Sequence, residues 1–299
     1  MKRFLISLII LVILIVCVVY WVQQQLLFYP IRKIEWNPRD NGMDYEEFFI
    51  DPIGGRSDKP VGESMWAWKF TFNPHERTVL FCHGNAGNIS HRSYIVNICR
   101  TMGLNVLLID YKGYGRSSSN CSVSGLYSDA DIVVSYLLKN NIVGSKLIIW
   151  GESLGGAFAS HIASKVPCNR LVLMATFSSL DDIVKYKSRP WLSRIISLTT
   201  NTLPSKNRLS YVLAPTLIMH SVEDELIPFQ CSLVLFNSVR SQDKQLIRIR
   251  GRHAYPELTE TNLRDLMRFL DVDDSKITDD LLREHILEIR SVCDRFTLL

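Results

Sequence analysis

The sequence lacks the features that mark a zinc cluster, a nucleic-acid-binding arm or a repeat array. Its seven cysteines form no CxxC pair, so the closely spaced ligands of a zinc cluster are missing. The net charge is only +4 and the basic residues are scattered, which argues against a nucleic-acid partner. We therefore expect no metal, no cofactor and no nucleic acid, and we interpret most of the cysteines as buried free thiols.

Charge is also missing from one long run at the N-terminus. Residues 4–22 contain no charged side chain, and at about 1.5 Å per residue such a helix just spans a hydrocarbon core of roughly 30 Å. Tyr20 and Trp21 lie where interfacial aromatic residues belong. A cleaved signal peptide is the alternative, but the run ends in Val-Tyr-Trp-Val, a poor cleavage context. We expect an uncleaved, single-pass anchor in the lipid bilayer, and basic residues on both sides leave its orientation open.

Strand and helix patterns alternate after a predicted linker at 23–44. Apolar runs predict strands at 45–51, 64–72, 78–84, 105–113, 146–153, 170–177, 215–221 and 244–251. Helical patterns follow at 90–103, 123–141, 155–166, 229–240 and 260–271. This order predicts an α/β fold over 45–271, with a mostly parallel central sheet and helices on both faces. The first two strands have no helix between them, so we expect an antiparallel edge there.

Two segments depart from this alternation. Residues 178–212 insert about two helices between consecutive strands, and residues 272–299 form a C-terminal helical tail. Apolar residues recur in the tail at helical spacing, namely Leu282, Ile286, Ile289, Cys293 and Phe296. We favour a tail that packs on the core over one that binds a partner.

The stretch from Gly151 to Gly155 has the pattern G-x-S-x-G between a predicted strand and a predicted helix. A nucleophilic serine needs a sharp turn that lifts its hydroxyl above the sheet, and side chains two residues before and after it would collide there. The helix N-terminus that follows favours developing negative charge. We identify Ser153 as a candidate nucleophile, the alternative being a glycine-rich turn without chemistry.

An acyl-transfer site also needs two N–H donors for the oxyanion of its transition state. The backbone N–H of Leu154, directly after the serine, is one candidate, and a loop after an upstream strand supplies the other. We choose Asn85 in that loop, since Gly84 allows the backbone to turn toward the site. His83 is a possible base, but we interpret it as a structural histidine that fixes this loop.

The acid of a serine–histidine site must hold the imidazole in one tautomer. The loop after the strand at 215–221 offers Glu223, Asp224 and Glu225 in a row. Because alternate side chains of an extended loop point in opposite directions, the two glutamates would face away from Asp224. We favour Asp224, the shorter and more rigid acid; a solvated acidic loop is the alternative.

Chain order selects the base. In this architecture the order is serine, then acid, then histidine, and only His253 and His285 follow Asp224. His285 lies within the helical pattern of the tail. His253 lies just after the last predicted strand, at the carboxyl edge where open α/β sheets bind ligands. We therefore predict His253 as the base rather than an ordinary surface histidine.

The ordered stretches HGNAGNISHR (83–92), DYKGYGRSSS (110–119), GESLGG (151–156) and HSVEDELIP (220–228) are familiar together. With them the chain resembles the α/β-hydrolases, in the membrane-anchored abhydrolase-domain branch that includes the bud-emergence homologues. The resemblance implies Ser153, Asp224 and His253 as a triad and Asn85 and Leu154 as oxyanion donors. It also implies a catalytic domain on the lumenal or extracellular side. Relatives carry His-Asn-Asp at the base, where this chain has His-Ala-Tyr, so the base loop is expected to be less firmly pinned.

Taken together, these patterns predict a serine hydrolase that cleaves carboxylic esters or thioesters of lipid or acyl-protein substrates. An esterase or peptidase for small soluble substrates, and a non-catalytic scaffold that retains the fold, are the alternatives. The insert at 178–212 occupies the family's cap position. Its apolar residues Trp191, Leu192, Ile195 and Ile196 would line an acyl pocket or form ordinary cap core.

Overall fold

The computed structural model describes residues 2–187, 194, 202–275 and 277–297, and its centre is one large sheet. In spatial order the strands are β12 (Tyr255–Glu257), β11 (Lys244–Arg252), β10 (Thr216–Ser221), β9 (Cys168–Met174), β8 (Gly144–Glu152), β5 (Thr78–Cys82), β7 (Asn105–Ile109), β4 (Met65–Phe70), β2 (Glu46–Ile50) and β3 (Arg56–Ser57). Neighbouring strands from β11 to β7 are parallel, and the outer pairs are antiparallel. The predicted mostly parallel sheet with an antiparallel edge is confirmed.

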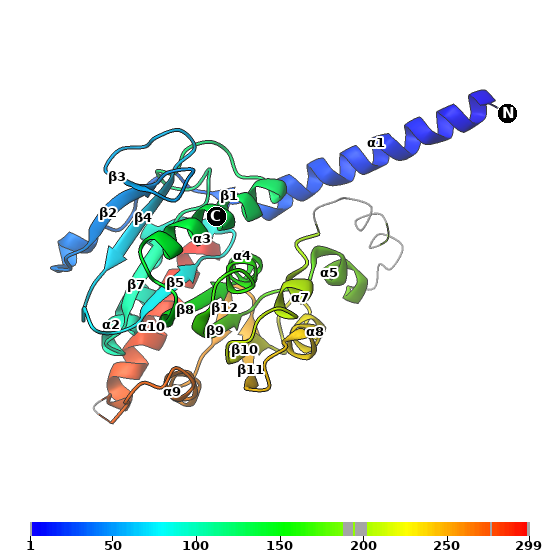
Figure 1. Cartoon of the computed structure of the whole chain (residues 1–299). Helices are drawn as coiled ribbons and strands as arrows, with labels where there is room; N and C mark the ends of the chain where they lie inside the picture. The colour runs from blue at the N-terminus through cyan, green and yellow to red at the C-terminus, as the bar shows by residue number, and fades with distance from the viewer. Residues whose placement is uncertain (1, 188–193, 195–201, 276, 298–299) are drawn as a thin grey trace.

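Helices cover both faces of the sheet, as expected (Figure 1). One face carries α2 (Ser93–Thr101), α9 (Glu260–Phe269) and α10 (Asp279–Thr297). The other carries α3 (Val123–Lys139), α4 (Leu154–Ala163), α5 (Leu180–Tyr186), α7 (Ser205–Leu209) and α8 (Gln230–Ser238). Because side chains alternate along a strand, β8 supplies Ile149 to one core and Ile148 and Trp150 to the other. We call these the α4 face and the α2 face.

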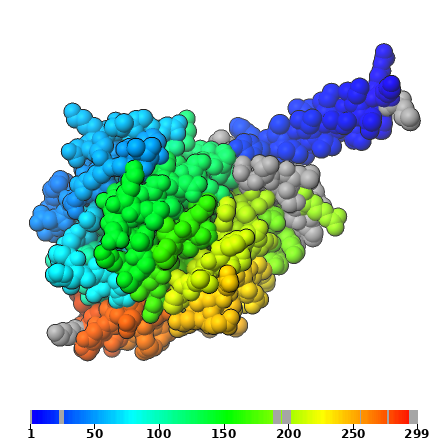
Figure 2. All heavy atoms as spheres, in the orientation of Figure 1, coloured from blue at the N-terminus to red at the C-terminus, as the bar shows by residue number. Residues whose placement is uncertain are grey.

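The N-terminal helix α1 (Lys2–Leu27) extends away from this body (Figures 1 and 2). Its segment Lys2–Val22 is long and apolar enough to cross a membrane, and none of it is buried within the protein. The apolar side chains that it leaves exposed, such as Phe4 and Ile13, are those that a hydrocarbon core would cover.

The segment that leaves α1 binds directly to the catalytic body. Tyr29–Pro30, in the predicted linker, forms β1 and pairs in parallel with β6 (Ala86–Gly87). The N–H of Tyr29 donates to the carbonyl of Asn85 at 3.0 Å. The guanidinium of Arg32 donates to the carbonyls of Ser117 and Ser119 at 2.5 and 2.9 Å. The chain next to the span therefore contacts the loop that sequence reasoning selected for the oxyanion.

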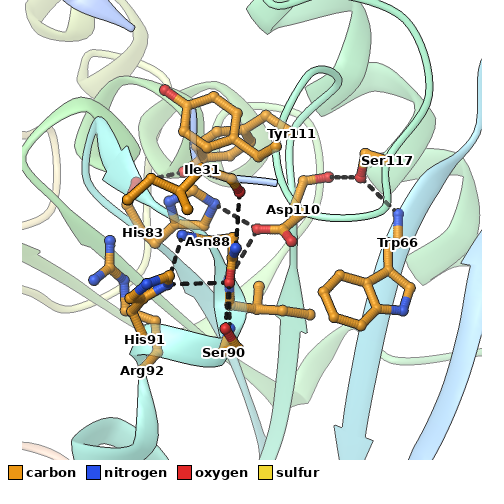
Figure 3. A network of polar contacts seen from close by, with 12 residues as sticks. Ile31, Trp66, His83, Asn88, Ser90, His91, Arg92, Asp110, Tyr111 and Ser117 are labelled. Atoms are coloured by element: carbon orange, nitrogen blue, oxygen red, sulfur yellow. Dashed lines mark hydrogen bonds and ion pairs between the residues drawn. The ribbon is translucent and has the colours of Figure 1, made fainter. Parts of the chain in front are cut away.

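Asn88, in the loop after β5, holds the chain that follows α1 through its side-chain amide (Figure 3). Its Nδ2 donates to the carbonyls of Ile31 and Lys33, both at 2.8 Å, and its Oδ1 accepts the N–H of Ser90 at 2.9 Å. The residue is fully buried. An amide that is removed from water and bonded on both sides fixes the loop strongly, because its partners would otherwise lose hydrogen bonds inside the protein.

Replacing this amide tests its contribution. We expect Asn88→Ala to lower the free energy of unfolding by about 2 kcal/mol or more, since the buried N–H and hydroxyl of Ser90 lose their acceptor and the chain after α1 loses two hydrogen bonds. The measurement is thermal or urea unfolding of the full chain in detergent. Asn120→Ala, an exposed asparagine, is the control and should change stability by less than about 0.5 kcal/mol. Equal stability of the two variants would contradict the assignment.

Candidate active site

Ser153 occupies a strained turn between β8 and α4. Its φ of 52° and ψ of −118° place a residue with a side chain in a region that favours glycine. The turn is held on both sides: the Ser153 N–H donates to the carbonyl of Met174 at 3.0 Å, and the Thr176 hydroxyl donates to the Ser153 carbonyl at 2.6 Å. This is the geometry that the G-x-S-x-G pattern predicts.

The flanking glycines are required by close packing. A Cβ on Gly155 would lie 2.0 Å from the carbonyl oxygen of Cys82 in β5. A Cβ on Gly151 would lie 2.6 Å from the carbonyl oxygen of Gly155. Neither backbone atom can move aside, so a side chain at either position would disrupt the turn at Ser153 between β8 and α4. The collision expected from the sequence is present in the structure.

The three residues selected for a triad lie in hydrogen-bond contact. His253 sits in the tight turn between β11 and β12, and its Nε2 lies 3.0 Å from the Ser153 Oγ. Its Nδ1 lies 2.7 Å from Oδ2 of Asp224. Because an ionised carboxylate only accepts, Nδ1 carries the proton of this bond, and Nε2 is left to accept the hydroxyl proton of Ser153.

The Asp224 carboxyl is buried and fully bonded. Its Oδ1 accepts the N–H groups of Leu226 and Ile227 at 2.9 and 2.7 Å. Burial acts to raise the pKa of Asp224, but hydrogen bonds from His220, His253 and Ile227 outweigh it and hold this pKa well below the ordinary value. The acid is therefore ionised at neutral pH.

Sequence reasoning missed His220 as a second partner of this acid. The buried imidazole ends β10, and its Nε2 lies 3.4 Å from Oδ2 of Asp224 and 2.9 Å from the carbonyl of Ile227. Since the carbonyl only accepts, Nε2 carries a proton here. The histidine begins the motif HSVEDELIP, four residues before the acid, and that position was the available signal.

Two glutamates bind the loop that carries His253, where relatives have an Asn-Asp pair that this chain lacks. Glu225 accepts the backbone N–H of His253 at 2.9 Å and forms an ion pair with Arg252 at 3.2 Å. Glu223 accepts the N–H of Gly251 at 3.1 Å. Both glutamates were predicted to face away from Asp224, and in the structure their carboxylates accept backbone N–H groups of the His253 loop. They provide the contacts that the missing Asn-Asp pair was expected to provide.

His83 fixes the loop that carries Asn85. The imidazole is completely buried, stacks on Tyr111 at 4.4 Å, and lies between two polar groups (Figure 3). Its Nδ1 donates to the carbonyl of Gly84 at 2.7 Å, and its Nε2 lies 3.2 Å from the Asp110 carboxyl, whose pKa is raised by burial. Holding the Gly84 carbonyl orients the peptide whose other end is the N–H of Asn85, because that unit is planar.

Leu154, the other oxyanion candidate, is the first residue of α4. Its backbone N–H belongs to the first turn of the helix, where N–H groups have no intrahelical partner. Gly84 approaches Ser153 closely: a Cβ there would lie 3.5 Å from the Cβ of the serine, an ordinary contact. The structure therefore brings the two candidate donors to Ser153 from β5 and from α4.

A cavity of about 130 Å³ lies beside Ser153. Gly84, Asn85 and His253 line it together with the serine. Three helices contribute apolar side chains: Ile95 and Ile98 of α2, Leu263 and Leu266 of α9, and Ile289 and Val292 of α10. Arg92 and Glu152 are the charged residues of the lining. The site thus joins a polar set of groups to an apolar space of the kind that binds small ligands.

None of the described residues of the insert at 178–212 lines this cavity. The predicted pocket residues Trp191, Leu192, Ile195 and Ile196 lie outside the described residues. The described part of the insert packs on the α4 face, through Leu180, Leu203 and Leu209. The cavity opens on the α2 face, whose core includes the C-terminal tail.

Comparison with known proteins agrees with this geometry. Residues 73–208 match the family described as serine aminopeptidase, S33. The chain is 28% identical over 252 residues to protein bem46 of Schizosaccharomyces pombe, covering 80% of each chain. It is 26% identical over 263 residues to the lysophosphatidylserine lipase ABHD12 of Danio rerio, covering 75% of this chain and 68% of that one.

A solved esterase from Pyrococcus furiosus, Pf2001, has the same fold, with a TM-score of 0.63 and 18% identity over 82% of this chain and 97% of the esterase. The sheet order, the elbow and the relatives are consistent with one another. The chain belongs to the α/β-hydrolase superfamily, in its abhydrolase domain-containing branch.

Proposed function

We propose that the chain is a membrane-anchored serine hydrolase that cleaves carboxylic esters or thioesters of apolar acyl groups. One observation carries the proposal: Ser153, His253 and Asp224 form a continuous chain of hydrogen bonds beside an apolar cavity. The lipase name of the ABHD12 relative supports a lipid-type ester, and α1 would hold the site next to a bilayer where such esters gather.

The contacts support a two-step acyl transfer. Ser153 Oγ attacks the acyl carbonyl carbon while its proton passes to Nε2 of His253. The resulting imidazolium is stabilised by Asp224, which remains ionised. When the tetrahedral intermediate collapses, the carbon–oxygen or carbon–sulfur bond breaks and His253 returns the proton to the leaving alcohol or thiol. Water then attacks the acyl-serine through the same base, releasing the carboxylic acid and restoring Ser153.

The N–H groups of Leu154 and Asn85 would stabilise the oxyanion in both steps. Donors that are already fixed contribute most, because they need not reorganise as the charge develops. His83 fixes one of them through the Gly84 carbonyl, and the strained elbow fixes the other. This division of roles makes His83 a positioning residue for the loop and leaves proton transfer to His253.

A peptidase acting on soluble substrates is the second candidate. The family description as a serine aminopeptidase favours it, and Glu152 offers an acidic group beside Ser153. Its Oε2 already accepts the Tyr94 hydroxyl at 2.6 Å, and most of the cavity wall is apolar. An acyl chain matches that wall better than a charged amino terminus does, so we rank ester cleavage first.

The nucleophile can be tested by covalent labelling. We expect a fluorophosphonate probe to label the full chain and to leave Ser153→Ala unlabelled, because only the activated serine reacts at a useful rate. Ser164→Ala, at the other end of α4, is the matched control and should label like wild type. A wild-type chain that does not label, or an equally labelled Ser153→Ala, would favour the non-catalytic scaffold.

The base can be separated from the other histidine that follows Asp224. We expect His253→Ala to lower kcat/KM for an acyl ester by about 10⁴-fold, since the hydroxyl loses its proton acceptor. His285→Ala removes one contact of α10, 2.8 Å from its ring to the Thr101 hydroxyl of α2, but leaves the proton acceptor in place, so it should lower kcat/KM by less than about tenfold. Near-normal turnover by His253→Ala, measured by release of the alcohol, would return His83 to consideration as the base.

The anchor and its orientation need a membrane experiment. We place the catalytic domain on the lumenal or extracellular side, following the family resemblance. Alkaline carbonate should leave the full chain in the membrane pellet, because about twenty apolar residues resist extraction. External protease should spare a C-terminal tag in sealed microsomes and digest it after detergent. Extraction by carbonate would contradict the span, and digestion without detergent would contradict the orientation.

A further inference from the structure

The tail helix α10 forms part of the cavity wall. Its residues Ile289 and Val292 line the space beside Ser153 and are 5% and 3% exposed. Leu287, on the same turn of the helix, is 61% exposed and faces away. Earlier members of the buried stripe, such as Ile286, pack on the α2 face without reaching the cavity. The tail therefore packs on the core, as predicted, and in doing so forms part of one wall of the site.

Polar contacts hold this wall in place. Glu288 accepts two hydrogen bonds from the Asn97 amide of α2, at 3.0 and 2.9 Å. The ring of His285, one turn earlier on α10, lies 2.8 Å from the hydroxyl of Thr101, the last residue of α2. Figure 1 shows α10 and α2 side by side on this face. Because the helix is fixed at successive turns, its inward side chains give the cavity a defined boundary.

The chemistry of the cavity favours the acyl chain over the leaving group. Its helical walls consist mainly of aliphatic side chains, together with Tyr94 of α2, and such walls would desolvate a phosphate, sugar or peptide leaving group without replacing most of its hydrogen bonds. The two charged side chains of the lining, Glu152 and Arg92, have opposite signs, and they already bond to the Tyr94 hydroxyl and the Ala86 carbonyl. A hydrocarbon chain needs no hydrogen bonds and gains from leaving water, by about fourfold in affinity for each buried methylene.

Size restricts the chain further. An apolar cavity of roughly 150 Å³ holds a benzene-sized molecule, which corresponds to about six carbons. The cavity here is of about 130 Å³. An acyl group of about six carbons would therefore fill it, and a much longer chain would meet the side chains of α9 and α10.

We propose that α10, through Ile289 and Val292, sets the length of the acyl chain that this site accepts, with an optimum near six carbons. The inference rests on the proposed function, because it assigns the cavity to the acyl part of an ester attacked by Ser153. It makes the C-terminal tail a specificity element of the enzyme.

The test is a chain-length profile. kcat/KM is measured for p-nitrophenyl esters from two to sixteen carbons, using the full chain in detergent. We expect the wild type to peak near six carbons. Ile289→Ala removes side-chain volume from the wall, so the ratio of eight-carbon to six-carbon kcat/KM should rise about tenfold. Val292→Phe adds volume and should move the optimum to about four carbons.

Two control variants on α10 distinguish a change in the shape of the cavity from a loss of stability of the protein. Ile286→Ala removes an equally buried side chain that does not line the cavity, and Leu287→Ala removes an exposed one. Both should keep the wild-type profile. If Ile289→Ala fails to fold, seen as loss of fluorophosphonate labelling, the milder Val292→Ala decides, and it should raise the same ratio by about fourfold.

The outcomes distinguish this inference from the proposed function. A wild type that hydrolyses esters but whose profile is unchanged in the Ile289 and Val292 variants overturns the role of α10. A wild type that prefers chains of fourteen carbons or more also overturns it. A wild type that neither labels nor hydrolyses any ester overturns the proposed function itself.

Discussion

The close approach of α4 to β5 is the constraint on which the rest of the site depends. Gly155 lies so near the Cys82 carbonyl that even a methyl group would separate the helix from the strand. This contact sets the sharp turn at Ser153, and it brings the residues that follow β5 next to the serine. The nucleophile and the loop of Asn85 are therefore positioned by one packing contact. A turn in a strained conformation persists only where surrounding structure determines it this strongly.

The loop after β5 is held from two further directions. On one side, the buried His83 links the Gly84 carbonyl to the Asp110 carboxyl at the end of β7. On the other, the chain that leaves α1 pairs with Ala86–Gly87 and is held by the Asn88 amide. A donor for an oxyanion is useful only if it is fixed before the reaction begins. In this chain the residues that follow α1 contact the loop that carries the candidate donor of Asn85.

Much of this arrangement could be predicted from the sequence, because the informative residues are local. The glycines around Ser153 indicate the sharp turn. The ends of the predicted strands, together with chain order, select Asp224 and His253 as candidates. The braces of the base loop could not be found this way. Glu223 and Glu225 reach it only because β11 and β12 form a tight hairpin, and the short β12 gives a weak apolar pattern. The pairing of Tyr29 with Ala86 could not be predicted either, because a strand of two residues shows no periodicity in the sequence.

The cavity illustrates a different limit. Its wall combines α2 with α9 and α10 from the other end of the chain, and the sequence indicates each of them only as an amphipathic helix. Nothing in one helix indicates which of its buried side chains meet a space and which meet other side chains. The insert was the expected location because it occupies the family's cap position, and its four candidate residues lie outside the described part of the chain. The α2 face instead gives the serine an apolar neighbour that is part of the fold core.

That placement has a consequence for catalysis. An acyl chain that fills the cavity displaces water from the surroundings of its own carbonyl, so the N–H donors of Leu154 and Asn85 act in a medium of low polarity where hydrogen bonds to a developing charge are strongest. Only a chain of fitting length excludes water without straining the wall. Length selection and rate enhancement would then arise from the same contacts, since the side chains that close the cavity also determine how dry the reacting carbonyl is.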